Sequence, residues 1–133
     1  MPALKEKTVS VRLIASDYAL LESQARRRFS KPARMGAVLL SYQLRRLNHP
    51  AIDFQELPEG GFVARLAGRR LSVWLVVDMV RQEGQRKASA TLGVPPSLIV
   101  AALNYAAEFA EEIAADTRLG QRTVKECGLE IPA

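Results

Sequence analysis

The sequence predicts an α+β, mostly helical fold made of two small modules. One stretch near the N-terminus alternates apolar and polar residues, a Gly-containing turn separates two short apolar runs, and several segments have helical apolar spacing. A chain of 133 residues with 48% hydrophobic and 25% charged residues has room for a packed core. Charge divides the chain too: ten basic and three acidic residues give residues 1–50 a net +7, and nine basic and eleven acidic residues give residues 51–133 a net −2.

The first element expected is a strand over residues 8–14. Its side chains alternate, with Val9, Val11 and Leu13 on one face, which is typical of a half-buried strand. A lone strand leaves its backbone groups unpaired. The economical solution is a homodimer in which two such strands pair antiparallel.

Two helices are expected after this strand. Ser16 is the predicted N-cap of the first, which ends in the basic run of residues 26–28. Ser30 is the predicted N-cap of the second, because Pro32 is tolerated in a first turn, and this helix runs to about Leu47. A stripe on the second helix is expected to need a partner chain, and it comprises Met35, Val38, Leu39 and Tyr42.

The segments KTVSVRL (7–13), SDYALLESQARRR (16–28) and SKPARMGAVLLSYQL (30–44) resemble the ribbon-helix-helix family of bacterial DNA-binding proteins. The resemblance covers about residues 6–47 and implies a dimer that places its paired strands in the major groove of DNA. Many members have a glycine between the two helices, where this chain has Phe29 and its neighbours.

The polar face of the predicted strand supplies candidate base contacts. Arg12 can donate to guanine O6 and N7, and Ser10 is an adaptable donor. The start of the second helix offers N–H groups and cations to phosphate. A solvated edge strand and an ordinary helix cap are the competing interpretations. The expected DNA-binding residues are Lys7, Thr8, Ser10, Arg12, Ser30, Lys31 and Arg34.

The chain from residue 51 predicts a β-hairpin followed by three helices, over residues 51–116, and a C-terminal tail over residues 117–133. The last helix is expected to be long and unbroken, because its apolar spacing continues to about Ala115. The expected elements are strands at 54–57 and 62–66, a third strand or turn at 71–73, and helices at 74–82, 86–92 and about 95–115.

The segments ARLAGRRLSVWLVVDMVRQEG (64–84) and ATLGVPPSLIVAALNYAAEFAEEI (90–113) resemble a bacterial family catalogued as domain of unknown function 433. The resemblance covers about residues 52–115, although Arg70 stands where a threonine is common. It implies a helix-turn-helix-like domain and the role of an antitoxin that neutralises a PIN-like ribonuclease. The tail is expected to pack on this domain or to bind the partner protein.

A second DNA surface is an alternative for this module. Its candidate residues are Arg86, Lys87, Ser97 and Asn104. A three-helix scaffold for dimerisation or partner binding is favoured instead, because acidic residues that repel phosphate are expected on the same long helix. These are Glu108, Glu111, Glu112 and Asp116.

Other function classes have little support in the sequence. One cysteine (Cys127) and one histidine (His49) cannot build a tetrahedral metal site, and no catalytic constellation or cofactor motif is present. No apolar run approaches 18 residues and the N-terminal residues MPALKEKT lack an apolar signal core, so a cytoplasmic protein without membrane contact is expected. The predicted function is a dimeric, double-stranded-DNA-binding transcription regulator and antitoxin. The alternative is an oligomerisation or protein-interaction module without a DNA target.

Overall fold

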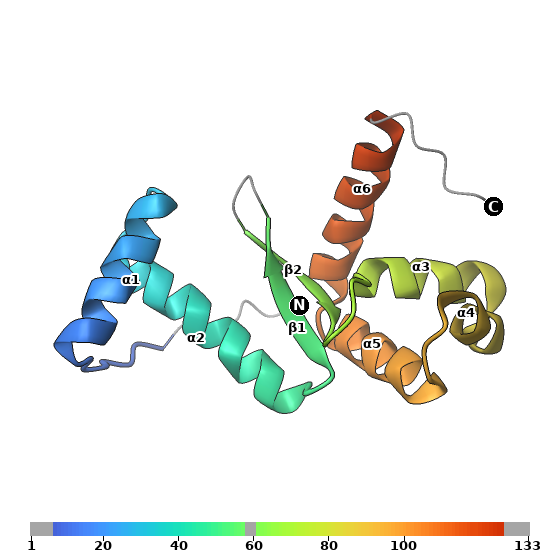
Figure 1. Ribbon diagram of the computed structural model, residues 1–133, viewed down its shortest axis with the longest axis horizontal. Coiled ribbons are helices and arrows are strands. Elements are labelled where there is room, and N and C mark those ends of the chain that lie inside the picture. Colours follow the sequence, from blue (N-terminus) through green and yellow to red (C-terminus); the bar gives the residue numbers. More distant parts are fainter. Residues whose placement is uncertain (1–6, 58–60, 127–133) are drawn as a thin grey trace. The chain divides into compact units, whose positions relative to one another are not determined.

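The computed structural model describes residues 7–57 and 61–126 (Figure 1). These residues form six helices and one two-stranded antiparallel sheet, so the predicted α+β, mostly helical class is confirmed. The chain divides into two compact units, Met1–Ser41 and Tyr42–Ala133, with the boundary inside a helix. The elements are α1 (Ala15–Arg27), α2 (Pro32–Asn48), β1 (Ile52–Glu56), β2 (Phe62–Leu66), α3 (Val73–Glu83), α4 (Gln85–Leu92), α5 (Pro96–Glu108) and α6 (Ala110–Glu126).

The first unit contains α1 and the first part of α2. Residues 7–14 pair with no other segment of the described chain, so the expected strand is not formed within the single chain. Helix α1 begins one residue before the predicted cap: Ile14 is the N-cap, with extended backbone and no side-chain cap bond, and Ser16 lies inside the helix. The predicted cap at Ser16 is therefore wrong. Among the described residues of this unit, only Ala25 and Met35 are buried.

A left-handed residue joins α1 to α2. Phe29 has φ = 51°, and the N–H of Ser30 donates to the carbonyl oxygen of Ala25 at 2.9 Å. This hydrogen bond ends α1 and turns the chain toward α2. The conformation is one that glycine adopts without strain.

The second unit is built around a hairpin and three helices. The predicted hairpin is formed, with Ile52 opposite Leu66 and Phe54 opposite Ala64, although β1 spans 52–56 and not the expected 54–57. The expected third strand at 71–73 is reduced to one bridge, between Arg65 and Ser72, because α3 starts at the next residue. The largest fully buried side chains of this core are Tyr105, Ile52, Leu66, Ile99, Val73 and Val76.

The second half of α2 belongs to this core. Tyr42 packs against Phe54 and Phe62, with ring centroids 4.5 Å and 4.8 Å apart. The expectation that Tyr42 needs a partner chain is therefore wrong, because the hairpin of the same chain covers its ring.

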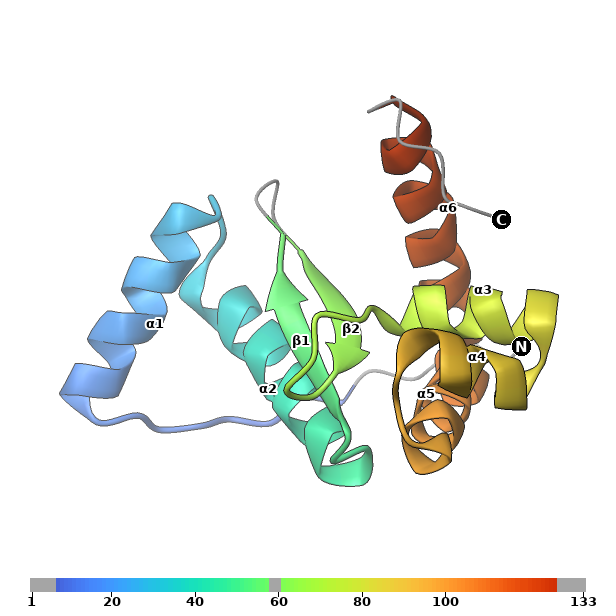
Figure 2. The ribbon, with the colours of Figure 1, turned by 45° about the vertical axis from the view of Figure 1, so that its right-hand side comes forward.

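The predicted long C-terminal helix is two helices. Phe109 lies between α5 and α6 with a non-helical backbone (φ −117°, ψ 47°), and α6 leaves in another direction (Figure 2). The ring of Phe109 packs 4.7 Å from that of Tyr105, and the Arg45 guanidinium lies 4.2 Å above it. These contacts with α2 and α5 hold the residue at the break.

No single helix in the described ranges is long and apolar enough to cross a membrane. Helices α4 and α5 reach that length only when they are counted together, and they are bent by 115° at their junction.

Candidate functional site

The N-terminal segment carries the first set of predicted DNA contacts. Lys7, Thr8, Ser10 and Arg12 are all exposed, and none has a side-chain partner in the described chain. The apolar face of the segment is exposed as well, with 75% of the surface of Val9 accessible. Both faces of the segment are thus free to be covered by another molecule.

The second predicted set lies at the junction of α1 and α2, which we call the basic turn (residues 26–34). Lys31 and Arg34 are exposed and have no ion-pair partner among the described residues. No acidic residue occurs in the sequence between Glu22 and Asp53. Ser30 precedes the helix but its Oγ contacts only the carbonyl oxygen of Lys31, at 3.5 Å. The basic turn therefore concentrates positive charge at a helix start, where N–H groups lack intrahelical partners.

The structure brings Ser30, Lys31 and Arg34 together in one turn. It records no contact between these three residues and Lys7, Thr8, Ser10 or Arg12 in the part of the chain that it describes.

The third candidate set surrounds the junction of α4 and α5. Gly93 ends α4 in a left-handed conformation (φ 67°). Two side chains fix this junction: the Arg69 guanidinium donates to the Gly93 carbonyl oxygen at 3.3 Å, and Ser89 Oγ donates to the Val94 carbonyl oxygen at 2.5 Å. The junction is therefore held by hydrogen bonds from both sides.

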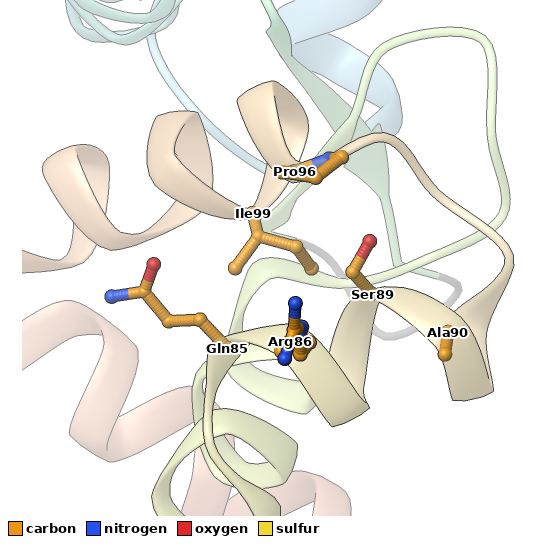
Figure 3. A pocket seen from close by; sticks show the side chains of 6 residues that line it. All are labelled: Gln85, Arg86, Ser89, Ala90, Pro96 and Ile99. Atoms are coloured by element: carbon orange, nitrogen blue, oxygen red, sulfur yellow. The ribbon is translucent and has the colours of Figure 1, made fainter.

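Arg86 and Lys87 on α4, and Ser97 and Asn104 on α5, are all exposed. A pocket of about 420 Å³ lies between the two helices, and of these four residues only Arg86 lines it (Figure 3). Ser97 and Asn104 lie outside that lining. The lining residues are Gln85, Arg86, Ser89, Ala90, Pro96 and Ile99.

The acidic residues expected beside this surface are placed differently. Glu111, Glu112 and Asp116 are on α6, beyond the break at Phe109, so the expectation of one shared helix is wrong. Glu108, the last residue of α5, has its Oε2 2.6 Å from His49 Nε2. The charge argument against a DNA surface on α4 and α5 thus loses most of its basis.

A polar cluster that the sequence interpretation missed connects α2 with α5 and α6. Arg45 donates to Glu112 Oε1 at 2.5 Å and to the Tyr105 hydroxyl at 3.1 Å, and that hydroxyl donates to Glu112 Oε2 at 2.6 Å. The signal was a matched spacing: Arg45 and His49 are four residues apart at the C-terminal end of α2, and Glu108 and Glu112 are four residues apart across the break between α5 and α6. Arg45 contacts the carboxylate on α6 and His49 contacts the one at the end of α5.

Burial governs the ionisation of this cluster. It raises the pKa of Tyr105 above its ordinary value of 10.0, and the charge of Glu112 adds to that rise. Burial, with a smaller effect of Glu112, also raises the pKa of Asp116 to about 6. The Tyr105 hydroxyl and the Glu112 carboxylate are both used in contacts within the chain. The cluster therefore holds α2 against α5 and α6.

Within residues 7–57 and 61–126, no three His, Cys, Asp or Glu side chains lie close enough together to hold a metal ion. Residues 117–126 of the predicted tail continue helix α6, and the rest of the tail, which includes Cys127, lies outside the described residues. No protein-family model, curated protein or solved structure matches the chain.

Proposed function

We propose that the protein is a homodimeric DNA-binding regulator whose first unit forms a ribbon-helix-helix dimer. The observation that carries the proposal is the lack of a core in this unit. Two helices bury only Ala25 and Met35 among the described residues, while Val9, Val11 and Leu20 remain largely exposed. Apolar surface of this extent is stabilised by a second chain. Pairing of residues 8–14 across the dimer axis would cover this apolar surface and give their backbone N–H and C=O groups hydrogen-bond partners.

The arrangement of polar groups favours duplex DNA as the ligand of this dimer. Once paired in the dimer, residues 8–14 would present Ser10 and Arg12 opposite the apolar side chains, and a two-stranded ribbon fits the major groove. Lys31 and Arg34 are uncompensated cations at the start of α2, a position suited to phosphate. The paired strands would contact the bases, and phosphate contacts of the basic turn would set the position of the protein along the DNA.

A more specific role rests on the resemblance of the second unit to domain of unknown function 433. Under this proposal the chain is the antitoxin of a toxin–antitoxin pair, binds a PIN-like ribonuclease and represses its own operon. Glu108 and Glu112 contact His49 and Arg45 within the chain, so the exposed Glu111 is the member of this group that stays available to a basic partner.

A second DNA surface on α4 and α5 is the other candidate that an observation favours. The helices of a helix-turn-helix are joined by about 3–4 residues and cross at about 90–120°. Here residues 93–95 join helices that are bent by 115°. Residues 61–104 hold six basic and two acidic residues, a net +4, in contrast to the −2 of the whole segment from residue 51.

The competing class is an oligomerisation or interaction protein without a DNA target, and salt dependence separates the two. The full chain is titrated with duplex DNA at several salt concentrations, because release of counterions makes affinity fall steeply with salt. Arg12→Ala is expected to lose about 1–3 kcal/mol of sequence discrimination, whereas Lys31→Ala weakens binding to all duplexes alike and lowers the salt slope. Binding that is absent, or insensitive to salt and to both substitutions, would exclude the proposed interface.

A further inference from the structure

The left-handed position of the basic turn is occupied by a phenylalanine whose exposed side chain the folded chain does not explain. Phe29 is fully exposed, with an accessible fraction of 101%, so its ring packs against no other part of the described chain. Its φ of 51° lies in the left-handed region. This conformation is strained for a residue that has a Cβ atom, and it is not strained for glycine. Glycine at this position would fold with less strain. The ring is therefore a candidate for contact with another molecule.

The surroundings of Phe29 indicate which kind of molecule fits. Arg26, Arg27, Lys31 and Arg34 are exposed on either side of it in the sequence, with no acidic residue in the turn. The partner must accordingly have an anionic surface and, next to it, an apolar region that one aromatic ring can enter. Duplex DNA has this arrangement, because phosphates flank grooves whose floor is made of stacked bases. An anionic membrane has it as well, but surface binding there grows with the apolar area buried, and the turn offers a single exposed ring.

We propose that Phe29 is an apolar wedge that inserts between base pairs of duplex DNA, with phosphates on both sides held by the cations of the basic turn. Wedges of this kind partly unstack a base step and kink the duplex. The inference rests on the proposed DNA binding and goes beyond it, since it gives the turn a role in selecting deformable sequence as well as in holding phosphate.

The test compares two duplexes of equal charge that differ in stiffness. Alternating poly(dA-dT) contains TA steps that unstack easily, while poly(dA)·poly(dT) is stiff. The full-length protein and its Phe29→Gly variant are titrated with both polymers at low salt. Loss of the wedge is expected to weaken binding to the alternating polymer by about 5-fold or more, the value of one stacking contact. Binding to the stiff polymer is expected to change less than about 2-fold, with an unchanged salt slope.

Two further measurements separate contact from folding. Phe29→Gly removes backbone strain, so its midpoint of thermal unfolding is expected to rise while its DNA affinity falls, which a purely structural role of the ring cannot produce. Arg27→Ala is the matched control: it removes a cation from the same turn and is expected to weaken both polymers alike and lower the salt slope.

The outcomes distinguish this inference from the proposed function. If the protein binds both polymers and Phe29→Gly binds them equally well, the wedge is wrong and DNA binding stands. If the unmodified protein binds neither polymer, both proposals fail. If it binds phosphatidylserine vesicles through Phe29 and the substitution leaves DNA affinity unchanged, the ring serves a membrane surface and the wedge is again wrong.

Discussion

At the scale of single residues, the contact of Arg45 with Glu112 joins α2 to α6 within the second unit. About a quarter of each side chain is accessible, 23% for Arg45 and 28% for Glu112. Arg45→Met leaves the Glu112 carboxylate without its cation, and we expect a loss of about 1–3 kcal/mol in the free energy of unfolding, moderated by solvent. Urea denaturation measures it, as a lower midpoint at an unchanged slope.

Arg46→Met is the matched control for this substitution. Its side chain is 49% accessible and its Nε lies 3.7 Å from Asp53 Oδ1, so removal of this pair is expected to cost less than about 1 kcal/mol. Equal losses in the two variants would show that Arg45 does not clamp α2 to α6.

Asp116 makes stability depend on pH in a definite direction. Its Oδ2 is buried without a hydrogen-bond partner, and burial raises its pKa from 3.8 to about 6 in the folded protein. Between these values the folded carboxyl keeps a proton that the unfolded chain has lost, so this group lowers stability as pH rises through the window, and its full cost is present above about pH 6.

We therefore expect Asp116→Asn to become progressively more stable than the unmodified protein as pH increases from about 4 to about 6, with a constant difference above that. Urea midpoints of both proteins across this range measure the effect. A stability difference that is the same at every pH in this range would show that Asp116 ionises alike in the folded and unfolded chains.

At the scale of elements, local signals predicted most of the fold. Helices α3 and α4 end just before Gly84 and Gly93, close to their predicted bounds, and the two predicted hairpin strands pair with each other. The break at Phe109 could not be predicted in this way, because apolar spacing continues through it and the contacts that hold it come from Arg45 and Tyr105. The polar cluster was missed for the same reason: its members are distant in sequence and meet only through packing.

The packing of α6 on α3 gives an element-scale prediction. A Cβ at Gly120 would lie 2.3 Å from the Trp74 indole, so Gly120→Ala is expected to displace the ring and destabilise the protein, although alanine favours a helix. Trp74 is the only tryptophan, and its fluorescence reports the displacement. The control is Ala115→Gly at an exposed position of α6. It measures the difference in helix propensity between alanine and glycine alone, which is about 1 kcal/mol. A more stable Gly120→Ala protein would mean that α6 does not approach Trp74.

At the scale of the whole molecule, the exposed apolar residues are unevenly distributed along the chain. Of the large hydrophobic side chains that are exposed in the described chain, most belong to Met1–Ser41, although that unit is the smaller one. The second unit has a core of its own, whereas the first does not. We therefore expect stability and self-association to be coupled through the first unit, with an unfolding midpoint that rises with protein concentration.

Two matched substitutions locate the dimer contact. Leu39 on α2 and Val100 on α5 are similarly accessible in the single chain, at 39% and 45%, so a glutamate costs about the same at either position within one chain. Sedimentation at micromolar concentration is expected to give a dimer for the unmodified protein and for Val100→Glu. Leu39→Glu is expected to dissociate, because the charge would be buried without a partner between two copies of α2. A compact 14.7 kDa species of the unmodified protein would contradict the dimer, and dissociation by Val100→Glu alone would place the contact on the second unit.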